Sequence, residues 1–324
     1  MINHSGFLHA RALDGQGGAA ALSWPEAQSW TSDAGPLWLH LNFESSEVPK
    51  WLEQCSGLNR IAIAGLLAED TRPHALTRGS NLLLVLRGVN LNPGEDPDDM
   101  VSIRLWTDGQ RLISTQRRSL QSTGDILDSL DEGEGAENIP SLLLDWIDAL
   151  TWRMNDTIAQ SEDIVLGLEE RILAGETQGL RGALQRLRKQ SIVLRRYLSP
   201  QREAMNRLIA EPLEWLDEMH RLRLREITDR LIRYIEDLDQ ITDRAAVAQD
   251  ELMNRLSEQL NQRMYVLSIV AALFLPLGFF TGLMGINVGG MPGVDNPHAF
   301  WLVTGLCAAV LIALSLVFRA KRWF

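Results

Sequence analysis

The chain has 324 residues, enough for about two soluble domains, and its 45% hydrophobic and 23% charged residues are typical of globular proteins. Of its 42 acidic and 31 basic residues, one acid and three bases follow Arg263, so 41 acids and 28 bases precede the apolar end of the chain. This acidic part argues against nucleic acid as a partner, because phosphates attract basic surfaces, and it favours cations.

Residues 1–135 form the expected N-terminal α/β domain, in which apolar runs predict strands. The predicted strands are 38–43, 82–91, 100–106 and 111–117. Asn92-Pro93-Gly94 predicts a hairpin-like turn between the second and third of these strands. The glycine- and acid-rich stretch 124–137 predicts a linker or domain edge.

Residues 140–263 form the expected helical region, in which apolar side chains recur at helical spacing. One amphipathic stretch covers 140–173 and a second covers 180–209, with Pro200 as a candidate kink. No proline separates Pro212 from Pro276, and about 60 helical residues would extend about 90 Å. We therefore expect a stalk helix that continues into the next, apolar region.

Residues 264–324 form the expected membrane domain, because 264–284 and 299–318 are apolar runs long enough to cross a bilayer. The alternative is a pair of buried core helices in a soluble protein. Basic residues flank the two runs on one side only: Arg255, Arg263, Arg319, Lys321 and Arg322. The loop 287–298 has no Lys or Arg, so both termini are expected in the cytoplasm. Residues 1–22 show no basic start followed by an apolar run, so we expect no cleavable signal peptide.

A seven-residue register divides the stalk helix and the first span into two seams. The cytosolic part of the polar seam comprises Glu236, Gln240, Asp243, Asp250, Asn254 and Ser257. Its continuation is mostly small within the membrane, with a Met–Leu constriction, and comprises Asn261, Met264, Ser268, Ala271, Leu275, Gly278 and Gly282. The apolar seam comprises Leu231, Ile235, Leu238, Ile241, Ala245, Leu252, Leu256 and Leu260.

The polar seam predicts a pore, because a single helix cannot shield Asn261 and Ser268 from lipid. We expect this face to meet copies of itself around a water-filled axis. The alternative is a solvated coiled-coil face whose small residues form a packing seam within the membrane.

The first span ends in Gly285-Ile286-Asn287, between a long charged helix and a last span with a basic tail. Together with Glu69–His74, Leu112–Thr115 and Leu198–Glu203, this triplet gives the chain a resemblance to the CorA-type divalent-cation transporters, and within them to the ZntB branch. Gly-Ile-Asn stands where that family usually has Gly-Met-Asn. The resemblance covers essentially the whole chain. It implies an inner-membrane, funnel-shaped homopentamer with an α+β cytosolic domain, long stalk helices and two transmembrane helices, the first lining the pore.

The resemblance assigns the triplet to the outer mouth of the pore, where a ring of Asn287 amides would offer neutral oxygen ligands to a passing divalent ion. Gly285 would allow a sharp turn and close approach between neighbours. The loop departs from the family's Met-Pro-Glu-Leu, since it reads Met291-Pro292-Gly293-Val294 and its acid is Asp295. We therefore do not expect magnesium capture by a glutamate ring.

Zinc as the cargo follows from the resemblance, which also implies coupling to protons. The six histidines show no paired ligand spacing, and His298 alone lies at the expected mouth. Asn287, Asp243 and Asp250 are the candidate transient ligands, with Ni²⁺, Cd²⁺ and Co²⁺ as further candidate cargo. No carboxylate lies within either span to carry protons. Cys55 and Cys307 are too far apart in the sequence to suggest a disulfide framework or a thiolate site.

Two other functions remain open. A CorA-type channel for Mg²⁺, Co²⁺ or Ni²⁺ would keep the same architecture, whereas a non-conducting, membrane-anchored coiled-coil scaffold would need no pore. We expect neither an enzyme nor a bound prosthetic group, because the sequence has no nucleophile motif, phosphate loop or clustered metal triad.

Overall fold

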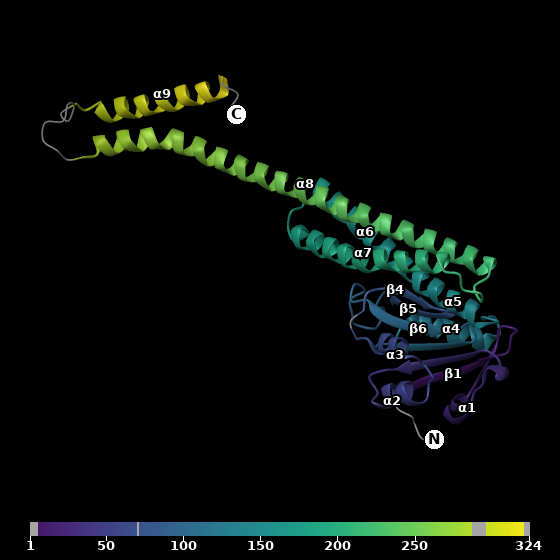
Figure 1. Cartoon of the computed structure of the whole chain (residues 1–324). Coiled ribbons are helices and arrows are strands. Elements are labelled where there is room, and N and C mark those ends of the chain that lie inside the picture. Colours follow the sequence, from purple (N-terminus) through teal and green to yellow (C-terminus); the bar gives the residue numbers. More distant parts are fainter. Residues whose placement is uncertain (1–5, 70, 287–295, 321–324) are drawn as a thin grey trace. The chain divides into compact units, whose positions relative to one another are not determined.

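The computed structural model describes residues 6–69, 71–286 and 296–320 (Figure 1). The chain divides into two compact units, Met1–Asp250 and Glu251–Phe324. The three-part division drawn from the sequence, with boundaries near 135 and 263, stays a prediction.

The first unit contains a seven-stranded mixed sheet with the strand order β2-β1-β3-β7-β6-β5-β4. Its strands are β1 (Phe7–Leu13), β2 (Ala19–Ala21), β3 (Leu37–Asn42), β4 (His74–Arg78), β5 (Asn81–Gly88), β6 (Val101–Thr107) and β7 (Arg111–Gln116). Neighbouring strands are antiparallel except β3 and β7, which are parallel. Four strands fall at the predicted positions, and β1, β2 and β4 were not predicted because their residues show no strong apolar run.

The predicted turn between β5 and β6 is present. Glu95 N donates to Asn92 O at 3.1 Å, which closes a four-residue turn, and Gly94 has φ 81°. Proline at the second position and a glycine with positive φ at the third are the residues that a type II turn requires.

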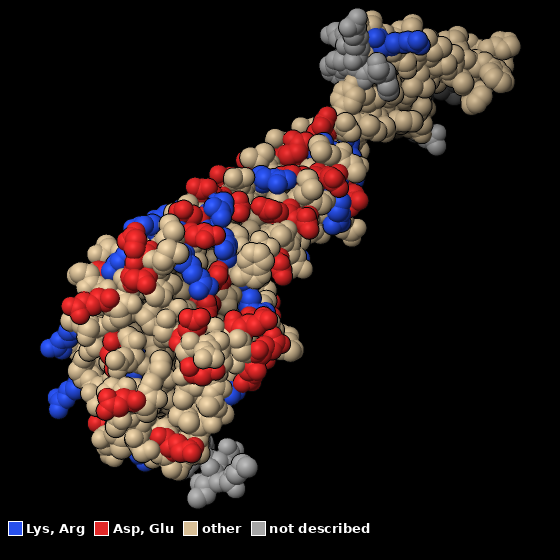
Figure 2. All heavy atoms as spheres, turned by 90° about the vertical axis from the view of Figure 1, so that its right-hand side faces the viewer, with Lys and Arg blue, Asp and Glu red and all other residues tan. Residues whose placement is uncertain are grey.

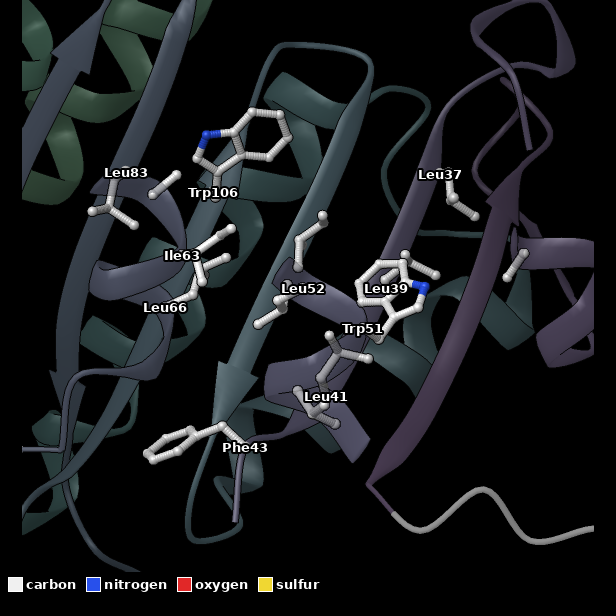
Figure 3. Close-up of a cluster of buried hydrophobic side chains, with 14 residues drawn as sticks. Leu37, Leu39, Leu41, Phe43, Trp51, Leu52, Ile63, Leu66, Leu83 and Trp106 are labelled. Atoms are coloured by element: carbon white, nitrogen blue, oxygen red, sulfur yellow. The ribbon is translucent and has the colours of Figure 1, made fainter. Parts of the chain in front are cut away.

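The strand β3 buries side chains in both directions, because helices cover both faces of the sheet. On one face Leu37, Leu39 and Leu41 pack against α2 (Glu47–Gln54) and α3 (Arg60–Leu67). These two helices contribute the helix residues that are labelled in Figure 3. On the opposite face Trp38 lies 5.5 Å, between ring centroids, from Trp146 of α5 (Ile139–Trp152). The short helix α1 (Trp24–Gln28) and a 3₁₀ turn (Ser32–Ala34) connect β2 to β3.

Of the two predictions for 124–137, the linker is wrong over most of its length, because helix α4 covers Gln121–Glu132. The domain edge stays a prediction. Ile126 and Leu130 lie one turn apart and are buried, while Asp125 and Asp128 lie outside the core. The helix ends at Gly133, which has φ 78°. The acids and glycines that suggested a linker therefore belong to the solvated face and the C-cap of an amphipathic helix.

The helical region consists of α5, α6 (Met154–Leu173), α7 (Leu180–Ala210) and α8 (Glu218–Met284). The single stretch predicted over 140–173 is divided at Arg153 into α5 and α6. Asn138 caps α5, since its Oδ1 accepts from Ser141 N at 2.9 Å. The helix α7 continues through Pro200, and α8 continues through Pro276. The last helix is α9 (Ala299–Ala320).

Candidate ion pathway

The apolar seam of α8 fixes the orientation of this helix in the first unit. Its first members, Leu231, Leu238 and Ala245 among them, are buried. Ion pairs add to the packing: Arg230 pairs with Asp148 of α5 at 2.7 Å, and Arg244 pairs with Glu169 of α6 at 2.6 Å. The sequence analysis did not identify these partners, since their positions on separate helices give no signal until the helices are packed.

The polar seam is consequently exposed. Among its described members only Ala271 is partly buried, and the rest are exposed: Glu236, Gln240, Asp243, Asp250, Asn254, Ser257, Asn261, Met264, Ser268, Leu275, Gly278, Gly282 and Gly285. The structure thus leaves this face of α8 open to water, lipid or another chain. Its role as a pore wall stays a prediction.

No described residue forms an ion pair with the carboxylates of the polar seam. Glu236, Asp243 and Asp250 make no ion pair among the described residues, whereas the neighbouring Asp239 pairs with Arg195 at 2.5 Å. Burial raises the pKa of Asp237, and the charge of Glu236 raises it further. The exposed row therefore carries unneutralised negative charge on α8 before the apolar part of the helix begins.

The apolar part of the seam presents small and polar groups. A Cβ added at Gly278 or Gly282 would meet no heavy atom within 4 Å, so a second helix could approach closely there. Ser268 Oγ donates to Met264 O at 2.8 Å and is satisfied by its own helix. The exposed Asn261 amide has no hydrogen-bond partner among the described residues. Such an amide requires water or another chain if it lies at a membrane.

The outer triplet is described only in part. Gly285 N donates to Thr281 O at 3.0 Å and to Gly282 O at 3.1 Å, just after the end of α8, and Ile286 is exposed. Asn287 and Asp295 lie outside the described residues. His298 is exposed directly before α9, and its carbonyl accepts from Leu302 N at 3.1 Å. The residues of the predicted filter stay predictions.

A resident metal centre is not formed by the described residues, which contain no group of three or more His, Cys, Asp or Glu able to hold an ion. Transient contacts with successive oxygen atoms are the kind of binding that a moving ion requires.

The two apolar helices are not core helices. The apolar segments of α8 and α9 have mean hydropathies of 2.2 and 2.4. Only 6% of the segment in α8 and 0% of the segment in α9 is buried. Figure 2 shows interspersed acidic and basic side chains over the first unit and an almost entirely uncharged surface over the apolar helices. The exposure contradicts the alternative of two buried helices in a soluble protein, and lipid is the solvent that such surfaces fit. The class of protein is an α/β domain whose chain continues through a long helix into two candidate membrane spans.

The chain belongs to the family described as CorA-like Mg²⁺ transporter protein, whose model matches residues 33–322. It is 39% identical over 323 residues to the divalent cation transporter CmaX of Pseudomonas aeruginosa, with 98% of this chain and 97% of that protein covered. It is 36% identical to the zinc transport protein ZntB of Yersinia pseudotuberculosis, over 97% of this chain and 94% of the relative.

Solved structures share the fold over the full length. The structure of full-length CmaX has a TM-score of 0.86 and 36% identity, with 99% of each chain covered. The CorA magnesium transporter of Methanocaldococcus jannaschii has a TM-score of 0.83 at 18% identity over the whole of both chains, a likeness of fold alone. These matches confirm the predicted family and architecture.

Proposed function

We propose that this protein is a subunit of an inner-membrane divalent-cation transporter in which the polar seams of several α8 helices surround a central pore. The observation that carries the proposal is that the polar seam is exposed at every described position except Ala271, while the apolar seam of the same helix is buried from Leu231 to Leu252. The names of the CmaX and ZntB relatives, a divalent cation transporter and a zinc transport protein, support the cargo class.

The assembly that fits the proposal is a funnel-shaped homopentamer with both termini in the cytoplasm. Open space at Gly278 and Gly282 supports close packing between copies, and the basic residues beside the spans support the orientation. Five copies would place five rows of Glu236, Asp243 and Asp250 around the axis.

Zn²⁺ is the proposed cargo, with Asn287, Asp243 and Asp250 as transient oxygen ligands. Neutral amides bind a divalent ion weakly enough for it to leave, and the carboxylates concentrate cations before the membrane. Mg²⁺ is the second candidate because the family model carries that ion in its description. Proton coupling would need carriers outside the described parts of the spans, which contain no carboxylate.

The test is uptake of radioactive zinc into liposomes that contain the purified protein, with magnesium uptake measured in parallel. We expect saturable zinc entry and a single oligomeric mass by native mass spectrometry. An oligomer without flux of either ion would support the scaffold function instead. A monomer that conducts would exclude the shared pore.

A further inference from the structure

A polar cavity of about 460 Å³ lies in the first unit, at the carboxyl ends of the parallel strands β3 and β7. Four arginines line it: Arg87 from the end of β5, Arg104 from β6, and Arg117 and Arg118 from the segment after β7. Two lining acids, Glu44 and Glu69, come from the segments after β3 and α3. The cavity thus gathers four cationic side chains and two anionic ones in a chain whose formal net charge is −11.

Arg104 is the innermost of these charges. Its side chain is fully buried, and among the described residues its guanidinium donates to backbone carbonyls alone, of Ala68 at 2.8 Å, Glu69 at 3.1 Å and Ser102 at 3.3 Å. It also lies 4.6 Å from the ring centroid of Phe43. No carboxylate of the described chain forms an ion pair with it. Three of its five N–H groups donate to these described carbonyls.

A buried cation without an anionic partner is costly, because desolvation favours the uncharged form. Burial, together with the charges of Arg87 and Arg117, lowers the pKa of Arg104 to about 10. At neutral pH the group therefore stays charged, and no described residue forms an ion pair with it. An anion entering the cavity would supply one.

Arg117 and Arg118, unlike Arg104, lie at the rim of the cavity and form ion pairs. Arg117 Nε pairs with Glu44 at 2.7 Å, and both side chains are about half exposed. Arg118 pairs with Asp99 at 2.5 Å and with Glu95 at 3.0 Å. These exposed pairs can exchange partners at little cost, because surface ion pairs contribute little free energy.

Clamping of the segment between α3 and β4 accounts for part of this arrangement. Arg104 holds the carbonyls of Ala68 and Glu69, and Arg87 holds the carbonyl of Thr71 at 2.9 Å. A clamp of this kind needs hydrogen-bond donors but no net charge. Clamping therefore does not explain why charged side chains converge on an open cavity.

We propose that this cavity binds the phosphate group of a small soluble molecule. The planar fork of a guanidinium matches phosphate oxygens, and a phosphate monoester carries close to two negative charges. The volume suits a small ligand, and the carboxyl ends of parallel strands are where open α/β sheets bind ligands. The proposal does not depend on the transport function.

The experiment is equilibrium dialysis of radioactive inorganic phosphate against the full-length protein in detergent, at low ionic strength. We expect saturable binding of one phosphate per chain. Arg117→Gln should weaken it about tenfold, a change of about 1.4 kcal/mol. The matched control is Arg171→Gln, since Arg171 makes a similar half-exposed pair with Glu176 at 2.8 Å, far from the cavity in sequence. This control should bind phosphate as the unchanged protein does.

Four outcomes would overturn the proposal. Absence of saturable binding at millimolar phosphate would exclude the site, and equal binding by both variants would place the phosphate elsewhere. Acetate that displaces phosphate at equal concentration would show a carboxylate preference instead. Arg104→Lys tests whether binding needs the planar guanidinium fork or only a positive charge, because lysine keeps the charge without the fork. Retention of full affinity by a folded Arg104→Lys protein would also contradict the proposal.

Discussion

The ring of His40 is enclosed between the sheet and α5, where it lies 5.5 Å, between centroids, from the ring of Trp146. Ser114 Oγ donates to Leu39 O at 3.1 Å, so its oxygen accepts from Trp38 Nε1 and from His40 Nδ1, each at 2.8 Å. Burial, and then the charge of His9, lowers the pKa of His40 to about 3. The neutral ring is therefore the form that the folded protein accommodates.

His40 should make the protein less stable as the pH falls. The unfolded chain binds a proton at His40 near pH 6.5 and the folded chain only near pH 3, so between these values the unfolded state holds more protons. The free energy of unfolding should fall by at most about 1.4 kcal/mol per pH unit as the pH drops through this window. His40→Asn keeps an amide donor for Ser114 and removes the titration.

The measurement is the melting temperature in detergent between about pH 7 and about pH 5. The decrease on acidification should be smaller in His40→Asn than in the unchanged protein. The control is His74→Asn, because His74 is exposed at the edge strand β4. If His40→Asn and the unchanged protein lose stability equally, burial of His40 has no part in the acid response.

Asn287→Ala should abolish zinc flux and leave expression and oligomer size intact. One changed residue alters every position of an amide ring in an oligomer, while substitutions in exposed loops usually change stability little. Asn296→Ala is the control, since its side chain caps the turn before α9 by accepting from His298 N at 2.9 Å. Liposome uptake and size-exclusion chromatography measure the two properties. Normal zinc uptake by Asn287→Ala would refute the role assigned to the triplet.

Among the elements, α8 has two faces with different exposure. Leu238 is buried against the other helices of the first unit, while Asp243 is exposed. A seven-residue register was enough to separate these faces in the sequence, because one side of a helix recurs with that spacing. The register could not say what covers the exposed face, because a pattern within one chain carries no information about its neighbours.

Cysteines placed in the polar seam should react with a water-soluble thiol reagent in membranes. Ser268→Cys and Leu275→Cys would face water if α8 lines a pore, while Leu267→Cys and Phe279→Cys would face lipid or neighbouring helices and stay unreactive. The native Cys55, which is exposed, and Cys307 are first replaced by serine. Equal protection at all four positions would contradict a water-filled axis. Mass spectrometry of the labelled protein gives the extent of reaction.

Other elements show where sequence patterns fail. The strands β3, β5, β6 and β7 were predictable because both their faces are buried and their apolar runs are long. The strand β2 has three residues. The acids of α4 lie on its exposed face, and their grouping in the sequence resembles that of a linker. Short edge strands depend on pairing with a neighbour, which a local pattern does not contain.

For the whole molecule, the acidic composition predicts a field that concentrates cations. Replacing Asp243 and Asp250 together by asparagine should lower zinc flux at low ionic strength and lower it less at high salt, where the Debye length falls to about 3 Å at 1 M. Liposome uptake at two salt concentrations measures the difference. The control replaces Glu162 by glutamine and Asp163 by asparagine, two exposed acids of α6 that make no ion pair among the described residues.

Two outcomes would contradict the prediction that the acidic residues act through an electrostatic field. Unchanged flux at both salt concentrations would show that the acids are a solvated face without a role in conduction. An equal loss at both would indicate direct coordination of the ion, which salt screens little.

The sequence by itself determined the two apolar spans, the long helix before them, the polar seam and the family, because hydropathy, helical period and short motifs are local properties of the chain. Only the tertiary structure decided which residues distant in sequence meet. It paired Asp148 with Arg230 and brought Arg87, Arg104 and Arg117 to one cavity. Such contacts arise from the order of strands in the sheet and the packing of helices on it, which no local pattern specifies.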